Sequence, residues 1–460
     1  MAVGLAVIDD GGFSEGSRTR FAVVALLAAA AATWSDPARA RRFARQPVPA
    51  ILLVLAVLGA ISMAWTVGIA HEALHWAFAV AGFALTAFAS AILIRDRRDA
   101  AWAAALIAVL AVAMSVVGLV AAAIADEPYA HRQGKGLWRP AATFQYSPAL
   151  ALLIVSALPG LISGLCHARR WWQTLAVALG AAIVGAALSL TDSRTQIAFA
   201  LVAGATALWR PERLVGASRR EVGAALALVA AAGLGAYAVA GGYVPLRPPP
   251  DGTARLLAIA AVVAGAALAW TLLRARLAPA VLAALLLATG TAGAIAKPTP
   301  IEQPTTLVVK APAGAPAAGP AVRHPIRDKL LHGRLHIWGE AVETFADRPL
   351  YGGGADSYWF ASADHQGIKT VFYAHELPLE LAAELGIAGL LLALGLYGTA
   401  GRAIWRGRAG PAEWLLGPAA AAFLAANLVD WPWHLAGSGA VWALALGAMI
   451  GTSGATQDRH

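Results

Sequence analysis

The sequence has little charge and almost no cysteine. Asp, Glu, Lys and Arg make up 13% of its 460 residues, and Cys166 is the one cysteine. A lone cysteine excludes a disulfide within the chain. Ordinary soluble domains carry charge on about a quarter of their residues, so the scarcity of charge excludes that class. Residues 1–20 lack a long apolar run followed by a small-residue cleavage site, so we expect no removable signal peptide.

Long apolar segments are abundant instead. Hydrophobic residues make up 59% of the chain, and the mean hydropathy is +0.64. Apolar runs of about 18–25 residues, the length that crosses a bilayer as a helix, predict an all-α transmembrane bundle of about 12–13 spans. The predicted spans are 48–69, 76–94, 100–125, 148–165, 173–190, 195–209, 222–243, 254–273, 279–296, 385–401, 415–429 and 437–451. Phe21–Trp34 is short for a span; if it crosses, the N-terminus lies outside, and otherwise both termini lie inside.

Arginine is concentrated in alternate loops. The net charge of +9 and the isoelectric point near 10.0 can indicate nucleic-acid binding, but arginine-rich cytoplasmic loops explain them better, so we expect no nucleic acid partner. The positive-inside rule makes loops 39–45, 95–98, 169–170, 210–220, 274–276 and 402–408 cytoplasmic. The extracytoplasmic segments are then 71–75, 126–147, 189–196, 244–253, 297–384 and 430–437.

The longest outer loop divides the chain into three parts. Residues 1–296 and 385–460 are expected to hold the N-terminal and C-terminal transmembrane helices, and 297–384 the loop. Within it, 297–325 is rich in Pro, Ala and Gly, which predicts a flexible tether, and 326–384 is the expected helical, catalytic part. A helix over 326–346 would place Leu330, Leu331, Leu335, Trp338, Val342 and Phe345 near one stripe.

Two arginines and a histidine stand at the predicted outer border. Arg194 lies between two apolar runs, where an arginine either snorkels to lipid headgroups or binds an anion. Its guanidinium fork matches phosphate oxygens. Arg334, on the predicted loop helix, is either a solvated charge or a second phosphate ligand. No glycine-rich phosphate loop follows a strand, so a nucleotide site is not predicted.

The stretch FYAHELPLELAAELG, residues 372–386, predicts a helix that begins at the membrane border. Pro378 suits a first helical turn, which puts His375 just before the helix and Glu376 near its cap. Because a helix N-terminus attracts anions, His375 is placed to act as a base beside one, or is simply an interfacial polar residue. One face of this helix carries Glu376, Glu380 and Glu384. The repulsion between these like charges is tolerable if Arg or Lys lies opposite.

Aromatic residues gather at the outer ends of the predicted spans. NLVDWPWHLAG places Asp430, Trp431, Trp433 and His434 there, and tryptophans at this level usually form an aromatic belt. Aromatic faces can also stack on sugars, and Tyr358, Trp359, Tyr373 and Trp138 share that possibility.

A competing motif lies near the N-terminus. GIAHEALHWAF contains H-E-x-x-H, which on a helix directs His71 and His75 to one face for zinc, with Glu72 as a protease base. An intramembrane zinc metalloprotease is therefore one alternative, although no second motif supplies a third ligand. A transporter is another, although it predicts ionisable groups at midspan, and the predicted spans are almost free of charge.

In their order and spacing these features resemble the O-antigen ligase and O-antigen polymerase family over roughly 140–450. The family shows a Ser-Arg step between spans, an arginine shortly before a tryptophan in a large outer loop, a D-x-P-L-x-G-x-G run, and a histidine leading into E-x-G-x-x-G. The matching residues here are Ser193–Arg194, Arg334 and Trp338, Asp347–Gly354, His375, and Glu384–Gly389. ATFQYSP, residues 142–148, is similar to the family's segment before an earlier span, with Pro148 in place of its usual Asn, and Glu376 follows His375 where the family has Asn.

The resemblance implies an integral membrane glycosyltransferase in the bacterial cytoplasmic (inner) membrane. It would move a glycan from a polyprenyl (undecaprenyl) diphosphate carrier to a glycan or lipid acceptor, such as lipid A-core or a growing polysaccharide, on the extracytoplasmic face. No metal or nucleotide cofactor is implied. The implied catalytic residues are His375 as the base and Arg334 and Arg194 as phosphate ligands. Substrate contacts are expected from Glu376, Trp338, Tyr373, Tyr358 and Arg139.

Overall fold

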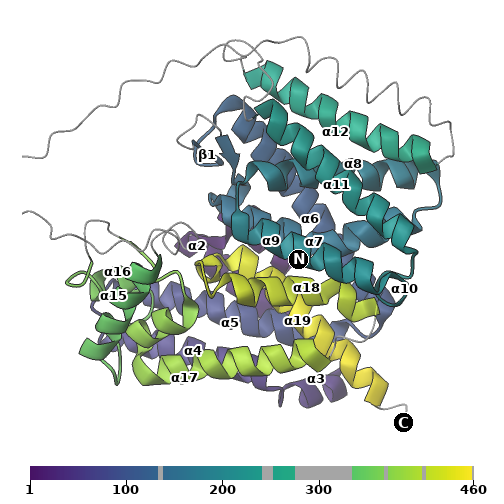
Figure 1. Ribbon diagram of the computed structural model, residues 1–460. Helices are drawn as coiled ribbons and strands as arrows, with labels where there is room; N and C mark the ends of the chain where they lie inside the picture. Colours follow the sequence, from purple (N-terminus) through teal and green to yellow (C-terminus); the bar gives the residue numbers. More distant parts are fainter. Residues whose placement is uncertain (133–137, 241–251, 275–333, 367–370, 407–410, 458–460) are drawn as a thin grey trace, which may run out of the picture.

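The structure, a computed structural model, describes residues 1–132, 138–240, 252–274, 334–366, 371–406 and 411–457. In this part of the chain one hairpin, β1 (Ala130–Arg132) paired antiparallel with β2 (Trp138–Pro140), interrupts an otherwise helical fold (Figure 1). The long helices are α2 (Glu15–Ser35), α4 (Pro47–Ile61), α5 (Ala70–Leu93), α6 (Arg97–Ile124), α7 (Ser147–His167), α8 (Trp171–Leu190), α9 (Arg194–Trp209), α11 (Arg219–Ala240), α12 (Gly252–Arg274), α15 (Arg334–Asp347), α17 (Leu377–Arg406), α18 (Pro411–Ala426) and α19 (Ala436–Gln457). Short helices are α1 (Ala2–Ile8), α3 (Pro37–Phe43), α10 (Pro211–Leu214) and α16 (Tyr358–Ala361), with 3-10 turns η1 (Asp10–Gly12), η2 (Ser62–Ala64), η3 (Ala142–Phe144) and η4 (Pro432–His434). The predicted all-α membrane bundle is confirmed.

Seven helices in the described residues are long and apolar enough to cross a membrane: α4 with η2, α5, α6, α7, α8, α11 and α17. Shorter apolar helices lie within α12, α18 and α19. Apart from 279–296, every predicted span coincides with a helix. The span 279–296, the tether 297–325 and the start of the loop helix, 326–333, lie outside the described residues, so the total of 12–13 spans stays a prediction.

Helix α2 extends between the two ends of the bundle and contains Phe21–Trp34. At its start, Arg18 reaches the loop residue Asp356. Beyond its end, Arg39 donates to the carbonyls of Ala91 and Gly451, at the far ends of α5 and α19. Its 21 residues span about 31 Å. Helix α2 is not among the seven helices of the described residues that are long and apolar enough to cross a membrane, so whether Phe21–Trp34 spans stays a prediction.

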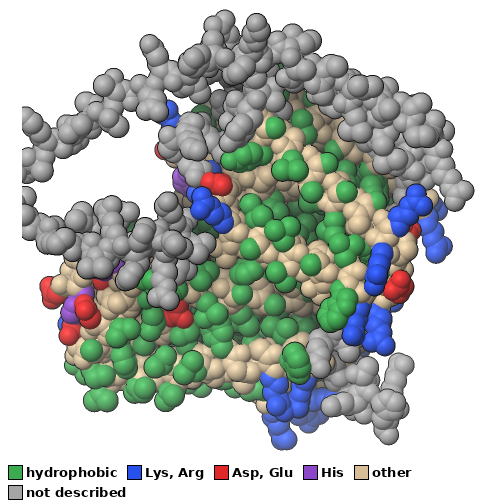
Figure 2. Space-filling view, viewed as in Figure 1, with side chains coloured by type: hydrophobic (Ala, Val, Ile, Leu, Met, Phe, Trp, Pro, Cys, Tyr) green, Lys and Arg blue, Asp and Glu red, His purple; other side chains and the backbone are tan. Residues whose placement is uncertain are grey.

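Charged side chains gather mainly at the two ends of the bundle. In Figure 2, most Lys and Arg side chains lie along the right-hand edge and toward the bottom, near α10 and α3, whereas most acidic and His side chains lie at the left edge near α15 and α16, and a smaller group of both signs lies left of centre near β1. Apolar side chains cover the surface between them. This distribution agrees with the predicted alternation of loops, because the arginine-rich ones share one end.

Small residues let the helices pack closely. A Cβ at Gly447 of α19 would lie 2.2 Å from the carbonyl oxygen of Ala87 in α5, and one at Gly439 would lie 2.2 Å from the Phe83 ring. Helices inside a membrane gain most of their attraction from such contact, since lipid tails are as apolar as the side chains. The Gly and Ala content therefore helps α5 and α19 form the centre of the bundle.

Candidate functional site

The run Asp347–Gly354 is held against the start of α17 by its backbone. Gly353 and Gly354 donate N–H bonds to the carbonyls of Ala383 and Glu384, at 3.0 and 2.7 Å. A Cβ at Gly352 (φ +66°) would lie 2.3 Å from the Glu384 carbonyl. Gly386 (φ +65°, ψ −155°) kinks α17 one residue after the predicted boundary at 384/385. The two glycine motifs of the sequence therefore form one packed joint, which we call the glycine joint, rather than a ligand loop.

The same run is also fixed to the connection between α4 and α5. The Val67 N–H donates to the Gly353 carbonyl at 2.8 Å, and the Ala355 N–H donates to the Ser62 hydroxyl at 2.9 Å. Both contacts secure the outer loop on the bundle end. They bring Asp356, next along the chain, to the start of α2.

The carboxylate of Asp430 is the centre of the site. It lies between α18 and η4 and is 7% exposed. Its Oδ1 accepts the Tyr146 hydroxyl at 2.6 Å, lies 3.2 Å from His375 Nδ1 and lies 3.7 Å from an Arg334 guanidinium nitrogen. The Leu377 N–H also donates to the Asn427 carbonyl at 2.8 Å, which ties the start of α17 to the end of α18. Segments far apart in the sequence thus converge on one carboxylate.

His375 occupies the predicted position just before α17, with φ +55°. Its side chain is 22% exposed, so the ring stays open to an incoming group while Nδ1 faces Asp430. Glu376 caps the helix by accepting the Leu379 N–H at 2.6 Å, which confirms its predicted place. Burial outweighs that hydrogen bond and raises the pKa of Glu376 to about 7.

The other two predicted cations lie on neighbouring elements. Arg139, in β2, is partly buried and donates from Nε to the Thr191 carbonyl at 2.6 Å. Burial lowers the pKa of Arg139, while the nearby carboxylates of Asp192 and Asp430 act in the opposite direction. Arg194 is the first residue of α9 and is exposed, and among the described residues it has no hydrogen bond or ion pair. No described contact joins it directly to Asp430.

The predicted substrate-contacting aromatics differ in exposure. The Tyr373 ring stacks between Trp431 and His434, with centroid distances of 4.9 and 3.9 Å. Trp338 is half-buried on α15. Tyr358 is 1% exposed and its hydroxyl donates to the Ile337 carbonyl, so it packs inside the loop and offers no open face.

The face that α15 buries differs from the predicted stripe. Leu335 and Val342 are exposed, and the buried residues are Glu340, Ala341 and Thr344. Ala341 packs with Tyr358 and residues of α17. The apolar spacing predicted the helix correctly but not its buried face, because the loop packs on α17 through small residues.

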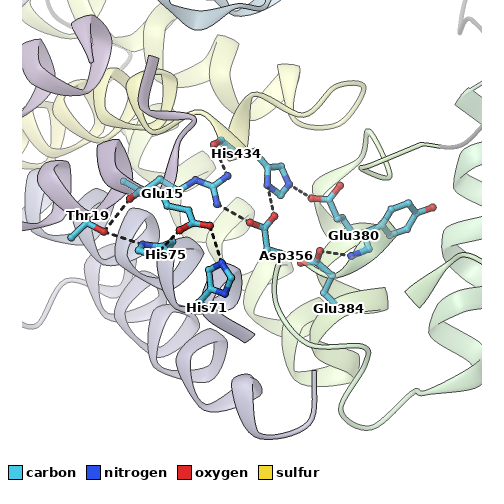
Figure 3. Close-up of polar contacts among 10 residues, drawn as sticks. Glu15, Thr19, His71, His75, Asp356, Glu380, Glu384 and His434 are labelled. Carbon is cyan, nitrogen blue, oxygen red and sulfur yellow. Dashed lines mark hydrogen bonds and ion pairs between the residues drawn. The ribbon is translucent and has the colours of Figure 1, made fainter. Parts of the chain in front are cut away.

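A second group of charges, missed by the sequence analysis, surrounds His434. Its Nε2 forms a very short contact with Glu380, and its Nδ1 lies 3.2 Å from Asp356. Asp356 in turn accepts Arg18 at 2.7 Å (Figure 3). Burial disfavours the charged imidazole, but the Glu380 and Asp356 carboxylates outweigh it and raise the pKa of His434 to about 10. Likewise burial opposes ionisation of Asp356, yet Arg18 and His434 hold its pKa well below the usual range.

Two expectations about this region need correction. Trp433 and His434 are each 2% exposed, so they are interior residues and not part of an aromatic belt. Within the described residues the glutamates of α17 are not matched by Arg or Lys: Glu380 meets His434, and Glu384 accepts the Tyr358 N–H at 3.0 Å. The pairing His434–Glu380 links residues 54 apart, so no local spacing could signal it.

The H-E-x-x-H motif forms the first turns of α5 rather than a short turn between two helices. His71 and His75 each contact Glu15 of α2, at 3.1 and 3.3 Å, and Thr19 bonds to His75 (Figure 3). Among the described residues no group of three or more His, Cys, Asp or Glu side chains is arranged to hold a metal ion. The zinc alternative therefore gains no support.

Comparison with known proteins finds a family similarity in part of the chain. Residues 252–394 match the protein-family model described as O-Antigen ligase. No curated protein matches the chain. The match includes α15, the glycine joint and His375, while Arg139, Arg194 and Asp430 lie outside it. Residues 252–394 are therefore similar to the O-antigen ligase family, within a multi-pass membrane protein.

Proposed function

We propose that the protein is a membrane glycosyltransferase that moves a glycan from a polyprenyl diphosphate carrier to a glycan or lipid acceptor, on the outer face of the cytoplasmic membrane. One observation carries the proposal: a histidine and two arginines from separate segments gather around Asp430 at one end of a membrane bundle. Ionisable groups are expensive near a bilayer, which makes such a gathering functional by default. The family match supports the reaction class.

A lipid-linked diphosphate requires cations at the membrane border and an apolar surface below them. Arg194 is an exposed, unpartnered cation of the described chain at the start of α9. An apolar groove of about 540 Å³ lies among α7, α8, α9 and α11, and is lined from α9 by Ile197, Leu201, Gly204 and Leu208. These positions follow Arg194 at helical steps on one face, so the cation stands at the head of the groove. In Figure 2 this part of the apolar surface is hollowed. An anionic head with a hydrocarbon tail fits this combination.

The geometry also suits transfer chemistry. If His375 Nδ1–H donates to Asp430, Nε2 carries the free lone pair and can accept a proton. In the proposed step the acceptor hydroxyl gives its proton to His375 Nε2, its oxygen bonds to the anomeric carbon of the sugar, and the bond from that carbon to the diphosphate oxygen breaks. Arg194 and Arg334 offset the charge that develops on the leaving diphosphate. We expect no metal or nucleotide to be required.

Other predicted residues have supporting roles in this proposal. Arg139 adds positive charge near Asp430. Tyr373 and Glu376 lie within two residues of His375 in the chain, and Trp338 lies one helical turn after Arg334 on α15; all three are proposed to contact sugar. Tyr358 is proposed to act only through packing, because it is buried.

Native mass spectrometry of the detergent-purified protein with added undecaprenyl diphosphate tests the proposal. We expect wild type to bind this lipid and Arg194→Ala and Arg334→Ala to bind it about 10–100-fold more weakly, since each removes a charge-assisted hydrogen bond. Arg220→Ala, an exposed arginine at the opposite end, is the matched control and should bind like wild type. Equal binding by all four proteins, or a tightly held zinc with no lipid, would refute the proposal.

A further inference from the structure

The charges around His434 come from four separate segments. Arg18 belongs to α2, Asp356 follows the glycine joint, Glu380 lies in α17 and His434 in η4. Their side chains are 6%, 10%, 4% and 0% exposed, respectively. Two cations and two carboxylates alternate along the chain of contacts, so the buried charges balance. A buried arrangement of this kind persists only when each member has its partner.

This network also fixes the segment that leads to His375. One Glu380 oxygen contacts His434, and the other accepts the Ala374 N–H at 2.7 Å. The His434 ring stacks on Tyr373 at 3.9 Å. Residues 373 and 374 are therefore held through both side chain and backbone.

His375 follows directly, in a left-handed backbone conformation with φ +55°. A non-glycine residue keeps such a conformation only when its surroundings impose it. The side chain of His375 is held by Asp430, whose Oδ1 lies 3.2 Å from His375 Nδ1. Its backbone is restrained from the N-terminal side by Tyr373 and Ala374, and through them by the network, and from the C-terminal side by the bond between the Leu377 N–H and the Asn427 carbonyl.

We infer that Arg18, Asp356, Glu380 and His434 are positioning residues that hold His375 against Asp430. The inference rests on the proposed role of His375 as the base. It extends the functional apparatus to α2 and η4, which lie outside the matched residues 252–394. None of the four touches the reacting atoms; they act through residues 373–375.

The labelling rate of His375 by diethyl pyrocarbonate, read by mass spectrometry, tests this without a substrate. His71, with a 61% exposed side chain, serves as the internal reference in the same sample. We expect Asp356→Asn to raise the His375 to His71 labelling ratio several-fold, because a released segment exposes the ring. Asp9→Asn, which removes the exposed ion pair with Arg20 of α2 and touches neither His71 nor His375, is the control and should leave the ratio within about twofold of wild type.

Glu380 supplies a second pair of variants in case Asp356→Asn does not fold. Glu380→Ala removes the acceptor of the Ala374 N–H and leaves no fixed cation unpaired, because His434 can release its proton. Glu380→Gln keeps an acceptor and should restore most of the wild-type ratio. A merely structural role would not give this rescue. A wild-type labelling ratio in folded Asp356→Asn or Glu380→Ala overturns the inference.

The two proposals fail in different ways. Undecaprenyl diphosphate binding should stay within about twofold of wild type in the positioning variants, since Arg194 and Arg334 remain. If His375→Ala retains full transfer activity, the proposed function fails whatever the labelling shows. If His375→Ala is inactive and the labelling ratio does not move, only the positioning role fails.

Discussion

Two histidine clusters at the same end of the bundle differ in sequence motif, in burial and in the number of segments that they join (Figure 3). The first, Glu15 with His71 and His75, contains a familiar short motif, yet its His71 and Glu15 side chains are 61% and 47% exposed. The second surrounds His434, which no motif marks, and the His434 and Glu380 side chains are 0% and 4% exposed. The exposed cluster joins two neighbouring helices, whereas the buried one joins four segments.

The difference shows that buried charged residues brought together from several segments indicate a functional site better than the spacing of a short sequence motif does. Exposed ion pairs are screened and contribute about 0–1 kcal/mol, so chance can place them. Buried charges are costly unless each is paired, so their presence needs a structural or chemical reason. His434 also stacks on Tyr373, two residues from His375, whereas within the described part of the chain no hydrogen bond, ion pair or ring contact joins His71 or His75 to that segment.

The largest expected effect separates His375 from the motif histidines. His375→Ala should lower kcat about 10²–10⁴-fold, the usual contribution of a general base. His71→Ala should leave kcat unchanged. The measurement is release of polyprenyl diphosphate from a glycan-loaded donor by the purified variants. Equal rates for the two variants would erase the distinction between the clusters.

The second-largest effect is expected in the stability of variants from the two clusters. Asp356→Asn leaves Arg18 buried without its carboxylate, which costs about 3–5 kcal/mol, whereas Glu15→Gln should cost about 0–1 kcal/mol. Thermal unfolding in a single detergent, followed by intrinsic fluorescence, compares the two. A Tm of Asp356→Asn at or above that of Glu15→Gln would contradict the buried network.

The pH dependence of unfolding should reveal the charged imidazole of His434. Its pKa rises from 6.5 to about 10 on folding, so its stabilisation is complete below pH 6.5 and is lost as pH rises through 10. The groups that face it are Asp356, Glu380 and Tyr373, with Arg18 at its carbonyl and Glu384 nearby. We expect the wild-type Tm to fall over this interval more than that of His434→Gln. Parallel curves would show that His434 is neutral.

A smaller effect is expected at the glycine joint. Gly386→Ala forces alanine into a backbone region used essentially by glycine, at a cost of about 1–3 kcal/mol, besides its contact with the Leu350 carbonyl. Gly398→Ala, in open space on the same helix, should stabilise by up to about 1 kcal/mol. Thermal unfolding of both variants provides the comparison, and a tolerated Gly386→Ala would show that the joint is loose.

The smallest effect is expected for metal content. Elemental analysis of wild type and of His71→Ala with His75→Ala should give the same substoichiometric zinc, because no group of three or more His, Cys, Asp or Glu side chains among the described residues is arranged to hold a metal ion. One zinc per wild-type chain, lost in the double variant, would instead give the exposed cluster a function.

Much of the site was predictable where chemistry is local. Pro378, as a first-turn residue, predicted that His375 precedes a helix and that Glu376 lies near its cap, and both positions are confirmed. Apolar length located the helices, because crossing a bilayer requires an uninterrupted run. The buried face of α15 was not predictable, since it depends on what packs against the helix.

The sequence by itself determined the membrane bundle, the helix positions, the resemblance to the O-antigen ligase family and the residues at the start of α17. Only the tertiary structure decided that Asp430 faces His375 and that Arg18, Asp356 and Glu380 surround His434. His375 and Asp430 are 55 residues apart in the sequence, and Arg18 and Asp356 are 338 residues apart. Local spacing carries no information at such separations, because the pairing is fixed by how whole helices pack and by the requirement that every buried charge find its opposite.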